Sequence, residues 1–144
     1  MKARLAFAAF VVLASASLSA HVMVSPLDAK VGATQKYEVR VHNEGKVAAT
    51  GIDLEIPADI TVVDVAQPAK GSYTTTKSGD RITAISWKVD VPTNKYLALP
   101  FTAKNPDAAK ELQWTIKEHL ADGSVVEWSS RPGAQQKGSV TKVK

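Results

Sequence analysis

Short segments that alternate apolar and polar residues recur along this chain, and they constrain its fold more than any other feature. Tyr37, Val39 and Val41 share one parity, while the residues between them are charged. A period of two residues is typical of a strand with one buried face, and turn signals such as Asp122-Gly123 separate the segments. No segment has a convincing helical period. The predicted strands are residues 36–41, 52–56, 61–65, 73–76, 81–89, 96–103, 112–120 and 125–129, with one more around Val22 and Val24.

Many short strands with regular turns favour an all-β fold, a two-sheet antiparallel sandwich of cupredoxin-like or immunoglobulin-like type. Pro100 cannot donate to a neighbouring strand, so its strand is expected at a sheet edge or with a bulge. Trp87 and Trp114 have apolar neighbours of the same parity and are expected in the core. Trp128, near the chain end, is expected at a half-exposed rim. The chain has no cysteine, so core packing alone must hold the fold.

The first twenty residues have the three parts of a secretory signal peptide: a basic start, an apolar run over residues 5–13 and a stretch of small residues. Two cuts compete. One follows Ala14-Ser15-Ala16, and the other follows Ala20 and leaves His21 first. The domain boundaries expected are a removed signal peptide at 1–20, a β-sandwich domain at 21–131 and a flexible basic tail at 132–144. The mature chain is expected in the periplasm or secreted, without stable membrane insertion, because no second apolar stretch follows.

Charge and motifs argue against several classes of function. Without Lys2 and Arg4, the 18 basic residues fall to 16 against 14 acidic ones, too balanced for the dense basic face that nucleic acid binding needs. The chain contains no nucleophile elbow, zinc-protease helix motif or phosphate loop. Without cysteine it can build neither a blue-copper site nor a thiol nucleophile. The sequence therefore predicts a protein that is not an enzyme.

His21 is the residue with the most distinctive chemistry, provided that the cut follows Ala20. As the first residue it would carry two metal-binding nitrogens, the α-amine and ring Nδ1, which together can close a small chelate ring on a metal ion. The alternative interpretation is an ordinary surface residue near a flexible end. Met23 shares the strand face of His21 if the segment is extended, and its thioether would favour Cu(I); more often such a residue simply packs.

Two further histidines and one carboxylate are candidates for the same chemistry. His42 and Glu44 follow the first long strand, where a turn is the ordinary explanation. If the first strand of the sandwich starts beside that turn, Glu44 would offer a carboxylate near His21, with His42 as a possible second ligand. His119 precedes a turn and is expected to face solvent.

Several segments, in order along the chain after residue 20, carry a family resemblance. They are His21-Val22-Met23-Val24-Ser25-Pro26; Tyr37-Glu38-Val39-Arg40-Val41 leading into Asn43-Glu44; Leu54-Glu55-Ile56-Pro57; Arg81-Ile82-Thr83-Ala84-Ile85-Ser86-Trp87; and Asp122-Gly123-Ser124-Val125-Val126-Glu127-Trp128 with Pro132-Gly133. The first resembles the His-Val-Thr-Val-x-Pro start of YcnI-like copper-binding proteins, and the set as a whole resembles that family.

The resemblance implies a cupredoxin-like sandwich that binds Cu(II) through a monohistidine brace. It places the brace on His21, the carboxylate on Glu44 and the aromatic residue beside the metal on Trp128, and it favours cleavage after Ala20. The function implied is copper storage, delivery or homeostasis, with copper-transport or copper-chaperone proteins as partners. Amine, imidazole and carboxylate donors suit Cu(II).

Two departures from the family pattern, and two other functions, stay open. Met23 replaces the usual Thr, and His42 stands where relatives commonly have Pro; either residue could add a ligand or shift the preference toward Cu(I). Glu38 and Glu55 remain alternative carboxylates. A histidine-brace copper oxygenase would need His42 or His119 as a second equatorial histidine. A metal-free immunoglobulin-like binding or adhesion module would need no metal at all.

Overall fold

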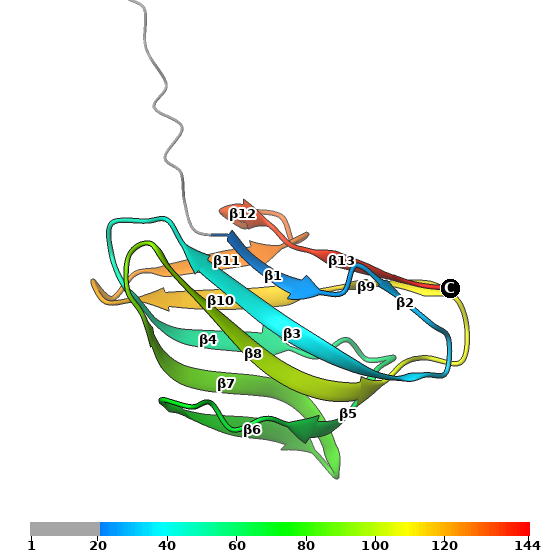
Figure 1. Ribbon diagram of the computed structural model, residues 1–144. Helices are drawn as coiled ribbons and strands as arrows, with labels where there is room; N and C mark the ends of the chain where they lie inside the picture. Colours follow the sequence, from blue (N-terminus) through cyan, green and yellow to red (C-terminus); the bar gives the residue numbers. More distant parts are fainter. Residues whose placement is uncertain (1–20) are drawn as a thin grey trace, which may run out of the picture.

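Two β-sheets face each other in the computed structural model, which describes residues 21–144 (Figure 1). The signal peptide expected at residues 1–20 lies outside the described residues. The first sheet has the order β1 (His21–Ser25), β3 (Thr34–Asn43), β8 (Lys95–Lys104), β5 (Thr61–Val65). The second has the order β12 (Gln136–Lys137), β11 (Val125–Ser129), β10 (Thr115–Leu120), β4 (Ala49–Glu55), β7 (Arg81–Val91), β6 (Ser72–Ser78). A third, small sheet contains β2 (Asp28–Ala29), β13 (Val140–Val143) and β9 (Lys110–Gln113).

The predicted alternation places the core between the two large sheets. Tyr37, Val39 and Val41 of β3 are fully buried, while the charged residues between them, Glu38 and Arg40, are partly exposed. The Tyr37 ring stacks on Phe101 of β8 and meets Trp114 from the opposite layer, each at a centroid distance of 5.5 Å. Burying one such side chain contributes about 1.5–3 kcal/mol. Trp87 and Trp114 are both buried, as predicted.

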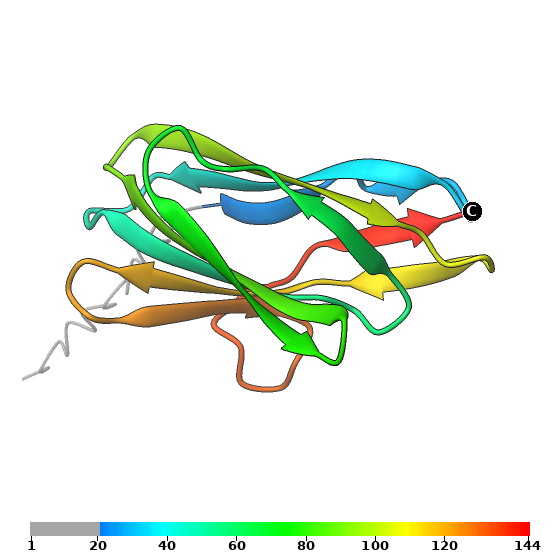
Figure 2. The ribbon, with the colours of Figure 1, turned by 90° about the horizontal axis from the view of Figure 1, so that it is seen from below.

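The expected all-β sandwich is confirmed, with two differences in detail. β11 and β12 pair in parallel, as do β2 and β13, whereas the other strand pairs are antiparallel. The small sheet closes one end of the sandwich, and its red strand β13 lies between the cyan and yellow segments in Figure 2. Within residues 21–144, no helix is long and apolar enough to cross a membrane.

The strand that carries Pro100 lies inside its sheet, so the prediction of an edge strand is wrong for β8 as a whole. β8 pairs with β3 on one side and with β5 on the other. The Pro100 carbonyl accepts the amide of Ala66, just beyond the last residue of β5, so the proline nitrogen faces the same side. β5 pairs with residues 101–104 of β8, so the missing N–H group lies just beyond the last paired residue, where it leaves unmade only the reciprocal bond to Ala66.

The predicted flexible tail at residues 132–144 is also wrong. Residues 136–137 pair with β11, and β13 pairs with both β9 and β2. Thr141 and Val143 of β13 are buried, so the domain extends to the end of the chain rather than stopping at residue 131. The single predicted strand at 112–120 breaks at Trp114 into β9 and β10, which belong to different sheets.

Candidate metal centre

His21 opens β1, an edge strand of the first sheet, and its side chain is exposed. The imidazole lies 6.3 Å from the Trp128 indole, centroid to centroid, with the ring planes 38° apart. Trp128 belongs to β11 of the opposite sheet, so this contact joins the two layers at one edge of the sandwich, where Figure 1 shows β1 close to β11 and β12. A shallow hollow of about 270 Å³ lies here, lined by His21, Met23, Trp128 and residues 136–139.

The segment after β11 holds this edge together. The backbone amide of Val24 donates to Ser139 Oγ at 2.9 Å, and Gly138 N donates to the Ser129 carbonyl at 3.1 Å. A Cβ at Gly138 would lie 2.6 Å from the Trp114 carbonyl oxygen, so only glycine permits this close approach. Backbone N–H groups point to alternate sides along a strand. Because the Val24 amide faces away from β3, the backbone nitrogen of His21, three residues earlier, faces β3.

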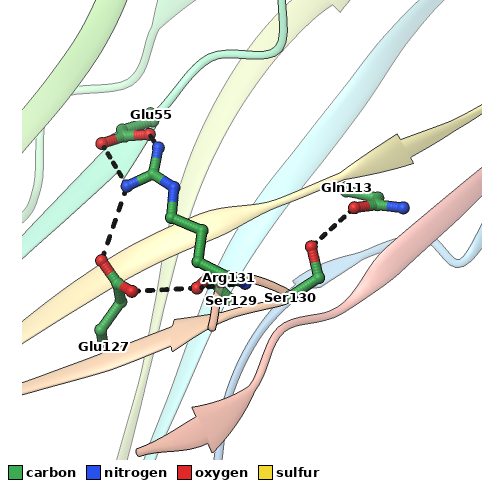
Figure 3. A network of polar contacts seen from close by, with 6 residues as sticks. All are labelled: Glu55, Gln113, Glu127, Ser129, Ser130 and Arg131. Atoms are coloured by element: carbon green, nitrogen blue, oxygen red, sulfur yellow. Dashed lines mark hydrogen bonds and ion pairs between the residues drawn. The ribbon is translucent and has the colours of Figure 1, made fainter. Parts of the chain in front are cut away.

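Trp128 is buried, with only 5% of its surface exposed, so the expected half-exposed rim position is wrong. The cause is β12, which pairs with β11 at Trp128 itself. A polar network fixes the chain directly after Trp128 (Figure 3). Ser129 Oγ donates to Glu127 at 3.0 Å and accepts the amide of Arg131 at 3.1 Å, and the Arg131 guanidinium pairs with Glu127 and Glu55.

Glu44 lies one residue beyond β3, in the turn that leads to β4. Its carboxylate is 3.5 Å from His42 Nδ1, and His42 faces His21 directly in the register of β1 and β3. The buried side chain of Asn43 fixes this turn: its amide group donates to the carbonyls of Val47 and Val91, and its oxygen accepts the Gly45 amide. Glu44 therefore lies beside His42, the residue opposite His21, and the His21 ring contacts Trp128.

The other sequence candidates lie elsewhere or have other partners. His119 is partly exposed and lies 2.6 Å from Asp53, a contact between two strands of the second sheet. Glu55 pairs with Arg131, and Glu38 lies 3.5 Å from Arg40. Within residues 21–144, no three His, Cys, Asp or Glu side chains gather as a metal-binding cluster.

Sequence reasoning missed Glu118, the acidic residue in contact with Trp128. Trp128 Nε1 donates to Glu118 Oε1 at 3.3 Å, and Glu118 is 2% exposed. Burial raises the pKa of the Glu118 carboxyl above its usual range, and the hydrogen bond from Trp128 acts in the opposite direction. The signal was present in the sequence. Glu118 has the same parity as Leu112, Trp114 and Ile116, so it replaces an apolar residue on a buried face.

Comparison with known proteins assigns the chain to a family. Residues 21–142 match the family described as Domain of unknown function (DUF1775). This chain belongs to the DUF1775 family. The DUF1775 match begins at His21, the residue at the candidate metal centre.

This DUF1775 chain is 28% identical over 132 residues to "Copper-binding protein CutI" of Bacillus subtilis (strain 168). The match covers 90% of this chain and 65% of that protein, so this chain spans about two thirds of the relative's length. Together the two matches confirm the resemblance to YcnI-like copper-binding proteins that the sequence motifs predicted.

Solved structures with low sequence identity share the fold of this DUF1775 protein. An uncharacterized protein from Nocardia farcinica with an immunoglobulin-like fold superposes with a TM-score of 0.72 at 16% identity, covering 85% of this chain and 97% of that one. A non-cellulosomal cohesin from Archaeoglobus fulgidus gives a TM-score of 0.53 at 13% identity, covering 88% and 91%. At such identities the likeness concerns the fold alone.

Proposed function

We propose that this protein binds Cu(II) outside the cytoplasm, in the periplasm or after secretion, and stores or delivers the ion rather than catalysing a reaction. The observation that carries the proposal is the position of His21. Its exposed ring lies against the buried Trp128 indole, at the strand end that cleavage after Ala20 would make N-terminal. The similarity to a protein named for copper binding supports the same metal.

The donor set suits this ion. An N-terminal His21 would supply its α-amine and Nδ1, and Glu44 would supply a carboxylate, all donors that Cu(II) accepts. Cu(II) also binds most tightly in the divalent series, so a site with few side chains can still hold it. The α-amine has an ordinary pKa of about 7.7–8.0, so the metal displaces a proton and its affinity falls as the pH drops. Trp128 would shield one side of the ion from water.

The exposure of the site favours storage or delivery. His21 is exposed at a sheet edge, and Glu44 lies in a surface turn, so a partner protein could reach an ion held between them. The partners we propose are copper-transport or copper-chaperone proteins. His42 lies opposite His21 in the register of β1 and β3, and its Nδ1 is 3.5 Å from the Glu44 carboxylate. It would therefore be the next ligand if the ion took a further donor.

The test is a Cu(II) titration followed by EPR and tryptophan fluorescence. Protein that begins at His21 is compared with the same protein carrying one extra N-terminal alanine. We expect tight one-to-one binding in the first protein and loss of that binding in the second, because the extra residue converts the amine into an amide. Equal binding by both proteins would place the site on internal residues. Binding by neither would favour the metal-free binding module.

The Glu44 carboxylate is tested in the same titration. Glu44→Gln is expected to weaken copper binding, because an amide oxygen is a neutral and weaker donor than a carboxylate. Glu111→Gln is the matched control, since Glu111 is an exposed glutamate on β9 of the small sheet. Unchanged affinity in Glu44→Gln would remove Glu44 from the site and leave the brace on His21 in place.

The register pair of His21 and His42 favours one other function, a copper oxygenase with both imidazoles on the ion. Such a site would oxidise a reductant with oxygen, and the turnover would disappear in His42→Ala. Absence of turnover in the copper-loaded protein would exclude this function.

A further inference from the structure

The buried side chain of Glu118 makes one hydrogen bond, and its second carboxyl oxygen makes none among the residues that the structure describes. Its Oε1 accepts the indole N–H of Trp128 at 3.3 Å, while Oε2 has no partner within residues 21–144. Burying a carboxyl group with an unpaired oxygen destabilises the folded state, because the desolvation of that oxygen is not compensated. Leucine at this position would avoid that penalty on a face that already contains Trp114 and Ile116. The arrangement therefore indicates a role beyond core packing.

Packing leaves space on one side of the Trp128 ring. A cavity of about 190 Å³ lies beside the indole, between Val47, Leu120 and Val126, with Glu118 also in its wall. The torsion that rotates an indole about its attachment is broad and roughly two-fold, so an indole with free space beside it has more than one accessible orientation. A single acceptor for the N–H group selects one of them, and Glu118 is that acceptor.

The selected orientation is the one that faces His21. Trp128 pairs with Ile116 of β10, and Glu118 lies two residues further along the same strand face. The same indole contacts Glu118 through its N–H group and lies 6.3 Å from the His21 imidazole. Rotating the indole would break the first contact and change the second.

We propose that Glu118 is a positioning residue of the copper site: its carboxyl group sets the orientation of the Trp128 indole against which His21 binds the ion. Glu118 does not contact the ion in this proposal, which rests on the proposed function. Removing an outer partner of a metal site typically weakens metal binding by about 10–100-fold. We therefore expect loss of the acceptor to weaken copper binding about tenfold.

The experiment uses protein that begins at His21 and combines two measurements. In copper-free protein, the ¹H–¹⁵N resonance of the Trp128 indole, assigned with Trp128→Phe, reports the hydrogen bond. In a Cu(II) titration, the dissociation constant reports the site. The variants are Glu118→Leu, which removes the acceptor, Glu118→Gln, which retains an acceptor oxygen without charge, and the exposed control Glu111→Gln. If Glu118→Leu does not fold, Glu118→Met, closer in shape to glutamate, replaces it.

The proposal expects Glu118→Leu to move the indole resonance and to weaken copper binding about tenfold, while Glu118→Gln and Glu111→Gln stay near the wild type. Unchanged affinity in Glu118→Leu would overturn it. Equal weakening in Glu118→Gln and Glu118→Leu would also overturn it, because the charge would then act on the ion directly. An undiminished effect of Glu118→Leu in a Trp128→Phe background would also overturn the proposal, because Glu118 would then act independently of the indole.

Failure of the proposed function has a different signature. If the wild-type protein that begins at His21 binds no copper, both proposals fall together. If the wild type binds tightly and Glu118→Leu binds equally tightly, the positioning role alone is refuted.

Discussion

Buried polar side chains hold this core at a few defined points. Tyr37 donates its hydroxyl hydrogen to Asn105 Oδ1 at 2.6 Å, and the Trp114 indole donates to Thr141 Oγ1 at 3.0 Å. Each bond joins residues far apart in the sequence, so each fixes how two distant segments of the chain pack. Removing one partner of such a pair leaves the other unpaired in a dry environment, which costs more than the hydrogen bond contributes on its own.

Tyr37→Phe is expected to lower the free energy of unfolding by about 1–3 kcal/mol, because Asn105 Oδ1 loses its donor. The wild type should also lose stability at high pH. Burial raises the pKa of Tyr37 to about 12, so the unfolded phenol ionises first and stability falls as pH rises from about 10 through about 12.

Denaturant unfolding at neutral pH and across this alkaline range measures both effects. The Tyr37 contribution to the alkaline loss should be absent in Tyr37→Phe. Tyr96→Phe is the control, since Tyr96 is 55% exposed and its change should stay within about 0.5 kcal/mol. Equal changes in the two variants would contradict the role given to the buried hydroxyl.

The family resemblance, rather than strand alternation, predicted the residues of the site. It implied His21 and Trp128 as site residues, and the structure brings these two side chains into contact. The burial of Trp128 was not predictable, because it depends on residues 136–139, which have no strand pattern of their own. Glu118 was readable as a charge on an apolar face, but its partner lies on another strand, and alternation within one strand does not reveal that.

At the level of elements, alternation predicted strands well and sheet membership poorly. Residues 61–65 form β5 as predicted, and the predicted strands at 73–76 and 81–89 form β6 and β7, which pair with each other. The apolar–polar alternation continues through Trp114, although the chain passes there from the small sheet to the second sheet. Alternation along one strand does not reveal which strand lies beside it. β12 and β13 are short and largely polar, so long-range pairing rather than local pattern determines them.

Gly138→Ala tests how β12 is held against β11. The added Cβ would meet two backbone atoms, the Trp114 oxygen at 2.6 Å and the Ser129 Cα at 2.7 Å, and neither can move without shifting a strand. We expect a loss of about 1–3 kcal/mol in unfolding free energy, as for other overpacked sites. The Trp128 emission should shift to longer wavelength as β12 moves away and water enters.

Gly51→Ala is the matched control for this substitution. Its added Cβ would lie 3.4 Å from side-chain atoms of His119, an ordinary contact distance, so we expect a small change in stability and none in the emission of Trp128. Comparable effects in the two variants would show that the close approach at Gly138 is not what holds β12.

At the scale of the whole molecule, the third sheet completes the sandwich. The chain has no disulfide to close it, so the end opposite the candidate site depends on packing and hydrogen bonds. β13 supplies both: it pairs with β9 on one side and β2 on the other, and it buries Thr141 and Val143. The last strand is thus part of the core although its sequence reads as a basic tail.

Deleting residues 140–144 should therefore unfold or severely destabilise the protein. The deletion removes the buried Val143 side chain, worth about 1.5–3 kcal/mol, and leaves the buried Trp114 N–H without Thr141, worth about 1–3 kcal/mol. Together these losses approach the whole stability of a marginal domain, about 5 kcal/mol. Lys144→Ala, which removes only an exposed ion pair with Asp28, should cost at most about 1 kcal/mol. A truncated protein that unfolds at the same denaturant concentration as Lys144→Ala would mean that the core closes without β13.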